Sequence, residues 1–468
     1  MTIVQLSKRV RVYSTILTIL VFGLLRSSAQ EQIPLVDTTF QPDIVATQGP
    51  GNGVNGIVVQ SDGRIIIGGN FTSVSGQPIT NLARLFSNGQ LDASFGISGT
   101  DGGVLDLAQQ PDGKILVSGT FTNLQGVPRQ GLGRLLTNGA VDMNFDVGPT
   151  LFATNGTAYK LALRPDGRIL VGTVNGSVCR LFQLNTNGGL DSPFTQTNLF
   201  AGWWIHSLLV RTDGTVLIGG GFSIVNGFSS PGLVVLDASG NLQTNFQSNL
   251  AMNSDIFAIL AQTNGGLLLG GELLHTNGSP STVMARLDSN LQWDTNFQTS
   301  SFTPFDFFAY IRSAILQADG KIVAGGDFDQ VGGYFRRYLV RLDANGKVDP
   351  CFDTDIGLGG VWGVNVVTAQ SDGRILAGGS FGIAGLVPNN LVRLLPQSDC
   401  NATRVYILKE GDGITAAGTC PPGGTNFLQS STNLFDWTDV DVETNPLLSA
   451  PIDPSASPST FYRVKKVY

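Results

Sequence analysis

The sequence predicts an all-β protein, a seven-bladed β-propeller of four-stranded antiparallel blades, and three observations support this fold class. Glycine makes up 60 of the 468 residues and charged residues only 13%, as expected for many short strands joined by tight turns. An Asp-Gly or Asn-Gly turn followed by a short apolar strand recurs along the chain. The turn glycines are Gly63, Gly113, Gly167, Gly214, Gly265, Gly320 and Gly373, so the period is 47 to 55 residues. A period of about 50 residues with strand-length segments is typical of propellers.

Each repeat contains four short strands, which the first repeat shows most clearly. They are expected at residues 55–60, 65–71, 81–86 and 90–95. Because every connection between them is local, the four strands predict one antiparallel blade. Gly68 and Gly69 lie inside the second strand, where glycine usually marks the close approach of another backbone. We therefore expect tight packing between blades at these glycines.

The outermost strand of the repeats ends in Asp-x-x-Phe, as from Asp92 to Phe95. No such segment follows the seventh repeat, whereas Asp37 to Phe40 precedes the first repeat with no strands of its own in front of it. We expect this N-terminal strand to complete the last blade and close the ring, which removes two free sheet edges.

Arginine recurs in the third strand of the repeats. The positions are Arg84, Arg134, Arg286, Arg341 and Arg393. A hairpin closed by a left-handed glycine places Arg84 opposite Asp92, and the same count pairs the others, with Arg393 opposite Asp37. In repeat four both partners are missing together, because Val235 and Gln243 replace them. We interpret the pairs as structural, half-exposed, and worth about 0–1 kcal/mol each.

The repeated strings are QPDGKILVSGTF, LVRLDANGKVDPCF and QSDGRILAGGSF. They resemble the delta-60 repeat β-propellers of exported bacterial proteins, and the resemblance covers residues 35–397. It implies the fold and export, and it brings no catalytic residues with it. Beyond residue 400 the period is lost, and STNL, a tryptophan and FYR resemble a short C-terminal β-module of exported bacterial proteins. We therefore predict a propeller at 35–397 and a small β-module at 400–468, which acts either in surface attachment or only as an appendage.

Residues 1–29 are predicted to be a secretory signal peptide. Lys8, Arg9 and Arg11 precede an apolar stretch at 12–25, and small residues follow at 27–29. An uncleaved anchor is the alternative, but 14 residues are short for a bilayer. We expect a secreted, periplasmic or cell-surface protein with no membrane span in the mature chain. The net charge of −7 argues against nucleic acid as a partner.

Export permits disulfides, and the chain has four cysteines. The short separation of Cys400 and Cys420 favours a bond between them, whereas Cys179 and Cys351 are expected to be free and buried. No Cys-x-x-Cys motif occurs, and the Asp-Gly turns lack the alternating oxygen ligands of a calcium loop. We predict no metal and no cofactor.

A binding site is expected on the face opposite the repeated turns, because there the loops vary in length and content. Three of these loops carry aromatic residues. They are Phe200, Trp203 and Trp204; Phe302, Phe305, Phe307, Phe308 and Tyr310; and Trp362. These side chains either bind a sugar or peptide or pack against one another.

The innermost strand supplies a second clue. Seven residues before each turn Asp or Asn, the residue type does not repeat, the positions being Asn55, Leu105, Tyr159, His206, Phe257, Arg312 and Asn365. This ring lines either a ligand site at the channel mouth or a water-filled channel. The candidate ligand-binding residues are Tyr159, His206, Arg312, Asn365, Trp203, Trp204 and Trp362. A lower ring, rich in glutamine from Gln60 to Gln370, is interpreted as holding the turns.

Catalytic groups are scarce in the predicted ring. The chain has two histidines, and Glu272 is the one glutamate inside the repeats, with Asp106 and Asp255 the nearest carboxylates to the mouth. We therefore predict no catalytic residues and an exported, monomeric, non-enzymatic scaffold that binds carbohydrate, protein or peptide. A hydrolase of extracellular polysaccharide and a purely structural surface or matrix protein are the alternatives.

Overall fold

The computed structural model is nearly all-β. The residues it describes are 4–7, 36–46, 52–96, 98–148, 156–176, 178–191, 194, 199–246, 250–274, 282–304, 309–349, 351–352, 354, 362–381, 390–396, and the backbone of 404–410, 413–419, 425–431, 438–443, 447–451 and 459–467. Within these ranges the regular elements are strands, apart from one 3₁₀ turn, η1 (Ala93–Phe95). No helix in the described part of the chain is long and apolar enough to cross a membrane.

Every repeat forms three antiparallel strands in the order inner, middle, outer. In the first three repeats these are β3 (Gly53–Val59), β4 (Ile65–Val74) and β5 (Leu82–Leu85); β6 (Val104–Gln109), β7 (Ile115–Gly119) and β10 (Leu132–Leu135); and β11 (Thr157–Leu163), β12 (Ile169–Asn175) and β13 (Val178–Leu184). In the fourth and fifth they are β14 (Leu199–Val210), β15 (Val216–Val225) and β17 (Leu233–Leu236); and β18 (Asp255–Ala261), β19 (Leu267–Leu273) and β20 (Thr282–Leu287). In the last two they are β22 (Tyr310–Leu316), β23 (Ile322–Asp327) and β26 (Leu339–Leu342); and β27 (Trp362–Ala369), β28 (Ile375–Ser380) and β29 (Leu391–Leu394).

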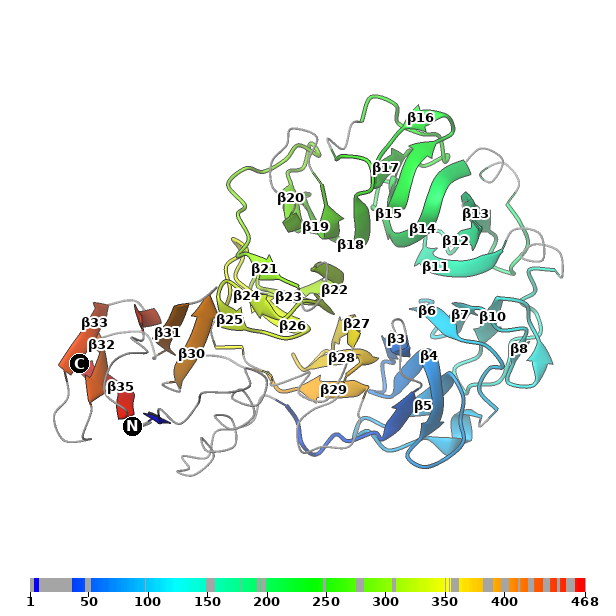
Figure 1. The fold of residues 1–468 in the computed structure, drawn as a ribbon. Helices are drawn as coiled ribbons and strands as arrows, with labels where there is room; N and C mark the ends of the chain where they lie inside the picture. The colour runs from blue at the N-terminus through cyan, green and yellow to red at the C-terminus, as the bar shows by residue number, and fades with distance from the viewer. Residues whose placement is uncertain are drawn as a thin grey trace.

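Figure 1 shows these sheets arranged around a common centre, with β3, β6, β11, β18, β22 and β27 innermost. Short strands decorate the periphery, namely β2 (Ile44–Ala46), β8 (Asn123–Leu124), β9 (Val127–Pro128), β16 (Phe228–Ser229), β21 (Phe302–Thr303), β24 (Gln330–Val331) and β25 (Tyr334–Phe335). The apolar core lies between neighbouring sheets. Ile66 of repeat one packs with Val117 of repeat two, and Leu376 of repeat seven packs with Ile57 of repeat one.

The fourth strand expected in each repeat is reduced to one bridge and a turn. The bridges are Leu85 to Leu91, Leu135 to Val141, Leu184 to Leu190, Leu236 to Leu242, Leu287 to Trp293, Leu342 to Val348 and Val36 to Leu394. The Asp of the Asp-x-x-Phe segment causes the turn, since Asp92 Oδ1 accepts a hydrogen bond from the Ser94 amide at 3.1 Å. An aspartate that caps its own backbone in this way ends the extended conformation.

Repeats three and four depart from the separate sheets that the sequence predicts, because they form one continuous sheet. Strand β13 is longer than the outer strands of the other repeats and remains paired with β12 out to Asn175 and Val178. Its exposed edge then pairs with the first residues of β14, with Val178 opposite Ala201. The segment that contains Trp203 and Trp204 is therefore strand and not loop.

The segment from Val36 to Phe40 joins the outer strand of repeat seven. The Asp37 amide donates to the Arg393 carbonyl at 2.8 Å, and Arg393 Nη2 lies 2.7 Å from Asp37 Oδ2. The Phe40 ring lies under the Arg393 guanidinium, 4.4 Å from its carbon, and packs against Gly89 of repeat one. Residues 36–40 thus contact both the last repeat and the first.

The predicted Arg–Asp pairs are confirmed, but four of the five are buried and not half-exposed. Arg84 Nε lies 2.8 Å from Asp92 Oδ2, and the two side chains are 4% and 2% exposed. Burial alone raises the pKa of Asp92, but hydrogen bonds from Ser94 and Arg84 hold it below its usual value. Only the Arg286–Asp294 pair is more open, at 20% and 22%.

Four of these arginines also bind the following repeat. Arg84 Nη1 donates to the Thr137 carbonyl at 2.8 Å, and Arg134 Nη1 donates to the Thr186 carbonyl at 2.5 Å. Arg286 makes the same bond to Ala344, and Arg393 makes it to Ser87 of repeat one. The acceptor carbonyl lies two residues before the glycine of the neighbouring turn. One arginine side chain therefore links its own repeat to the next.

Repeat three achieves the same contacts with different residues. Gln183 stands at the arginine position and donates to Asp191 Oδ2 at 2.7 Å. The guanidinium comes instead from Arg164, directly after β11, which donates to Gln183 Oε1 at 2.9 Å and to the Ala238 carbonyl of repeat four at 2.8 Å. The positive charge thus lies two strands further inward, and the carbonyl of the next repeat is still an acceptor.

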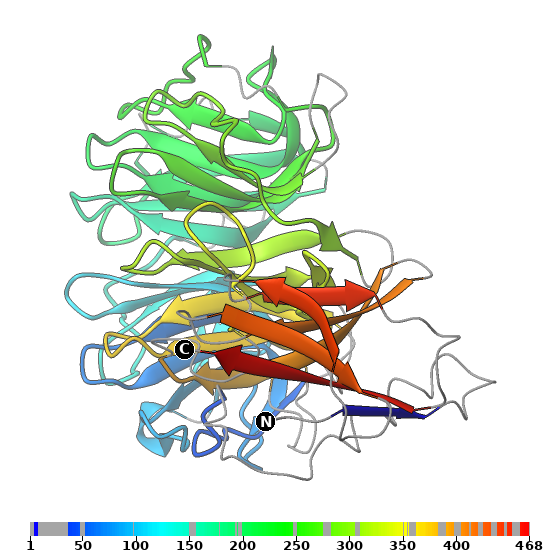
Figure 2. The ribbon, with the colours of Figure 1, turned by 90° about the vertical axis from the view of Figure 1, so that its left-hand side faces the viewer.

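The C-terminal strands form two further sheets outside the group of repeated sheets (Figures 1 and 2). One contains β1 (Val4–Ser7), β35 (Ser459–Val467), β32 (Thr425–Ser431) and β33 (Thr438–Glu443), and the other β30 (Arg404–Glu410), β31 (Gly413–Thr419) and β34 (Leu447–Pro451). Apart from β1, the predicted signal peptide lies outside the described residues.

Cysteine usage corrects one expectation. Cys179 is free and buried, as predicted. Cys351 is disulfide-bonded and not free. The bond favoured between Cys400 and Cys420 lies outside the described residues. The Cys351 amide donates to Asp349 Oδ1 at 3.0 Å, and the Cys351 side chain is partly buried.

Replacing a buried member of these pairs will destabilise the protein more than replacing an exposed one. We expect Arg84→Met to cost about 3–5 kcal/mol, because Asp92 is then buried without its partner. Arg374→Met is the control, since the Arg374–Asp372 pair is 38% and 46% exposed, and should cost less than about 1 kcal/mol. Urea unfolding followed by circular dichroism measures both. Equal losses would contradict the structural role of the buried pair.

Candidate functional site

All seven non-repeating positions of the inner strands are the extra residue of a β-bulge. In repeat one Val54 pairs with Gly69 and Gly56 with Gly68, so Asn55 has no partner of its own. The same shift leaves out Leu105, Tyr159, His206, Phe257, Arg312 and Asn365. A bulge changes the direction of a side chain, which explains why the residue type at these positions differs from repeat to repeat.

The glycine pairs of the middle strands make the bulges possible. A Cβ on the second glycine, such as Gly69, Gly220 or Gly271, would overlap a carbonyl of the bulged strand beside it. A Cβ on the first glycine would meet the next repeat, as Gly68 meets Val104 and Gly270 meets Ile311. The predicted packing role is therefore confirmed for the first glycine, and the second accommodates the bulge within its own sheet.

Four neighbouring repeats bring their bulge residues together in a continuous aromatic row. The rings of Tyr159 and Trp204 are 5.0 Å apart between centroids, and those of Tyr159 and His206 are 5.5 Å apart. His206 stacks on Phe257 at 4.2 Å, and Phe257 stacks on Tyr310 at 5.4 Å. The row is half-buried overall, and Trp204 at its end is 38% exposed.

Arg312 closes the far end of the aromatic row. Its guanidinium carbon lies 5.0 Å from the Tyr310 ring centroid, and Nη2 donates to the Tyr310 hydroxyl at 3.0 Å and to Asp327 Oδ2 at 2.8 Å. Burial raises the pKa of Tyr310 to about 12, so the hydroxyl stays protonated. The Arg312 charge is matched by Asp327 and is not free for an anion.

The other side of the ring is polar. Asn365 Nδ2 donates to Asn55 Oδ1 at 2.9 Å and to the Asn52 carbonyl at 3.1 Å. Asn55 Nδ2 in turn donates to the Val104 carbonyl of repeat two at 3.2 Å. These amides link repeats seven, one and two through hydrogen bonds, so Asn365 makes a structural contact apart from the aromatic row.

Three acidic side chains lie beside the aromatic row. Asp106 Oδ1 is 3.2 Å from Lys160 Nζ, and Asp106 Oδ2 accepts from the Leu161 amide at 2.9 Å. Asp255 Oδ2 is 3.4 Å from His206 Nε2, and Asp255 lies opposite Glu272 across β18 and β19. Burial, followed by the charge of Asp255, raises the pKa of Glu272.

The structure thus brings Tyr159, Trp204, His206 and Arg312 into one site, whereas hydrogen bonds join Asn365 to Asn52 and Asn55. Trp203 and Trp362 lie in strands β14 and β27, and the placement of their side chains is outside the described residues. Phe200 is buried against Phe222 at 5.1 Å, so of the two alternatives for this residue the structure shows packing. Phe257, Asp255 and Glu272 were not among the candidate ligand-binding residues. The distances of Phe257 and Asp255 from the turn nevertheless indicated that they lie at the same level of the inner strand as those candidates.

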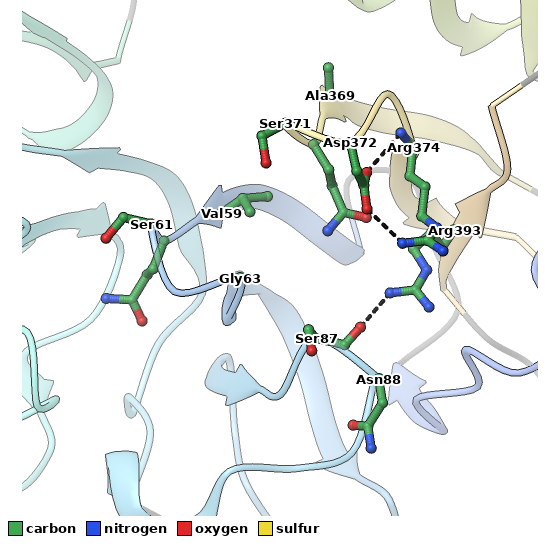
Figure 3. Close-up of a pocket in the computed structure, with 12 residues that line it drawn as sticks. Val59, Ser61, Gly63, Ser87, Asn88, Ala369, Ser371, Asp372, Arg374 and Arg393 are labelled. Carbon is green, nitrogen blue, oxygen red and sulfur yellow. Dashed lines mark hydrogen bonds and ion pairs between the residues drawn. The ribbon is translucent and has the colours of Figure 1, made fainter.

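A cavity of about 570 Å³ lies on the opposite, turn-bearing face, between repeats seven and one (Figure 3). Arg393 donates to the Ser87 carbonyl at its edge, and Asp372 pairs with Arg374 at 2.6 Å. Gln60 Oε1 and Gln370 Oε1 are buried there without a hydrogen-bond partner. The same glutamine position recurs at Gln262 and Gln317 with the same unpaired oxygen, so this feature belongs to the repeat and not to one site.

Five segments of the chain match the model of a protein family described as "Domain of unknown function (DUF5122) beta-propeller". They are residues 60–95, 110–145, 262–297, 317–352 and 370–399. The first four segments run from the lower glutamine to the Phe of the Asp-x-x-Phe turn. These segments of the chain are therefore similar to the repeats of a β-propeller family. The unmatched third and fourth propeller repeats are those in which Gln183 and Val235 replace the paired arginine.

No curated protein matches the chain. Among solved structures, YCF48 from Cyanidioschyzon merolae aligns with a TM-score of 0.41 and 14% identity over 76% of this chain and 98% of that one. A protein of unknown function from Bacteroides caccae aligns with a TM-score of 0.32 and 13% identity over 64% and 93%. A nidogen/laminin complex aligns with a TM-score of 0.32 and 10% identity over 51% and 76%.

Filling the space beside a bulge will disturb the aromatic row. We expect Gly220→Val to lower stability by about 1–3 kcal/mol, because the new side chain overlaps the Trp204 carbonyl and pushes the bulge outward. The near-ultraviolet circular dichroism of the aromatic residues should change as well. Ala261→Val, on an exposed position of β18, is the control and should stay within about 0.5 kcal/mol of the parent. An unchanged spectrum in Gly220→Val would contradict this account of the bulge.

Proposed function

We propose that this chain is an exported, monomeric, seven-bladed β-propeller that binds a ligand at the aromatic mouth of its ring and has no catalytic role. One observation carries the proposal: positions that do not repeat occupy the same bulge in every inner strand. Four of them form a continuous row with Trp204 and Tyr310. Variable side chains on a repeated, rigid framework are typical of recognition sites.

A closed ring is supported by contacts between repeats seven and one that copy those between interior repeats. Arg393 donates to Ser87 as Arg84 donates to Thr137. Phe40 packs against Gly89 as Phe95 packs against Gly139. The N-terminal segment therefore takes the place of the outer strand of a seventh blade, and the C-terminal module lies outside the ring.

Export is supported by the composition of residues 1–29 and by the disulfide of Cys351. Disulfides persist in oxidising compartments and are rare in the cytosol. We therefore propose a periplasmic, secreted or cell-surface location. A delta-60-type repeat, which the sequence resembles, fits the same location.

The closed ring has a direct test in the Asp37–Arg393 pair. We expect Asp37→Ala to lower the melting temperature as much as Asp92→Ala does, because both leave a buried arginine without its carboxylate. If residues 36–40 were a dispensable tail, Asp37→Ala would melt like the parent protein. Differential scanning calorimetry of the mature chain distinguishes the two results.

The binding role is tested with glycan and peptide arrays on the mature protein. For any ligand found, we expect Trp204→Ala to weaken binding at least about 10-fold, since exposed aromatic residues supply much of the contact energy in such sites. Trp293→Phe is the control, because Trp293 lies in the turn after β20 and away from the row. Equal affinity of both variants would place the site elsewhere, and no ligand would favour a structural surface protein.

A hydrolase acting on polysaccharide is the second candidate, and the raised pKa of Glu272 beside Asp255 favours it. Glycoside hydrolysis uses a pair of carboxyl groups, of which the general acid has a raised pKa. The same glycans should therefore be assayed for newly formed reducing ends. Formation of reducing ends by the parent protein, and not by the Glu272→Gln variant, would establish this alternative.

A further inference from the structure

The charges around the aromatic row are not evenly matched. Asp106 is paired with Lys160, and Asp327 with Arg312, at 3.2 and 2.8 Å. Asp255 and Glu272 face each other across β18 and β19, and among the described residues neither forms an ion pair with a lysine or arginine. Two adjacent carboxyl groups without a fixed cation are an unusual concentration of negative charge inside a half-buried site.

Two buried polar atoms at the same place lack hydrogen-bond partners. They are Asp255 Oδ1 and His206 Nε2, and the His206 side chain is only 9% exposed. A buried polar atom without a partner costs free energy that a bound group recovers when it supplies the missing bond. Asp255 Oδ1 accepts hydrogen bonds, so the missing group at that atom is a donor.

The aromatic row flanks these carboxyl groups. His206 contacts Asp255 directly and stacks between Trp204, 6.2 Å away, and Phe257, 4.2 Å away. Aromatic faces attract cations, and the attraction grows when water is excluded. A donor that is positively charged and carries an apolar stem satisfies the carboxylates and the rings together.

We propose that Asp255 and Glu272 bind the ammonium group of an alkylammonium ligand, with its carbon chain lying along Trp204, Tyr159 and His206. The ammonium donates hydrogen bonds to Asp255 Oδ1 and to the Glu272 carboxylate, which binds in its ionised form. A lysine side chain on a peptide and a free aliphatic amine share this chemistry. This inference rests on the proposed binding function and specifies the class of ligand for the same site.

Isothermal titration calorimetry of the mature protein tests the proposal with two cationic probes. They are n-butylammonium chloride and N-acetyl-lysine amide, each at an ionic strength held constant with sodium chloride. N-acetyl-norleucine amide is the neutral comparison, because it keeps the carbon stem and lacks the charge. We expect both cations to bind and the neutral probe to bind at least about 10-fold more weakly, since only a cation neutralises the carboxyl pair. If only the lysine probe binds, the ligand is a peptide. If the two cationic probes bind equally, the ligand is a free aliphatic amine.

The variants Glu272→Gln and Asp255→Asn should each weaken the cationic probes at least about 10-fold while preserving side-chain size. Asp319→Asn, in the turn between β22 and β23 on the opposite face, is the matched control and should leave binding unchanged. Melting curves verify that each variant is folded, and raising the salt concentration should weaken binding in the parent.

The inference is overturned if the norleucine probe binds as well as the lysine probe, or if Glu272→Gln binds the cations as tightly as the parent. If a neutral glycan or peptide binds in a way that depends on Trp204 while neither cationic probe binds, the cationic inference fails and the proposed function stands. If no probe or array ligand binds at all, both fail.

Discussion

The close approach of a glycine backbone to a bulged inner strand is the constraint on which the rest of the structure depends. At Gly69, Gly220 and Gly271 any side chain would overlap a carbonyl of the neighbouring strand. The absence of that side chain permits one extra residue in the inner strand, and the extra residue is the one that varies. The same glycine pair therefore provides tight contact between repeats and an inner row of side chains that the repeat does not specify.

The turn-bearing face is held by a second recurring unit, in which an arginine joins an aspartate, a phenylalanine ring and a carbonyl of the following repeat. Arg84 contacts Asp92, the Phe95 ring at 4.4 Å and the Thr137 carbonyl. A buried charge is tolerable only when its partners are complete, so losing one member is costly. Repeat three retains the contacts with Arg164 and Gln183, which indicates that the geometry matters more than the residue that supplies it.

The two faces of the molecule differ in how their polar groups are paired. On the turn-bearing face the arginine and aspartate side chains meet partners at the same position in most repeats, and this regularity gives rigidity. On the other face the partners differ from repeat to repeat, as Lys160 meets Asp106, Arg312 meets Asp327, and Asp255 meets His206. Charge that the framework does not neutralise is available to a ligand.

The sequence by itself determined the number and length of the repeats, the position of the turns and the pairing of Arg84 with Asp92, because these depend on local turns and on a fixed count of residues. The sequence also indicated that Tyr159, His206 and Arg312 lie at one level of the inner strands, because a position that varies within a strict repeat stands out. Only the tertiary structure decided that the ion pairs are buried, that Phe200 packs inward, and that Asp-x-x-Phe forms a turn and not a strand. Only it decided that Asp255 and Glu272 meet beside the aromatic row while Asn365 joins an amide chain elsewhere. These outcomes depend on which strands become neighbours and how their bulges direct each side chain, and no spacing along one chain encodes that.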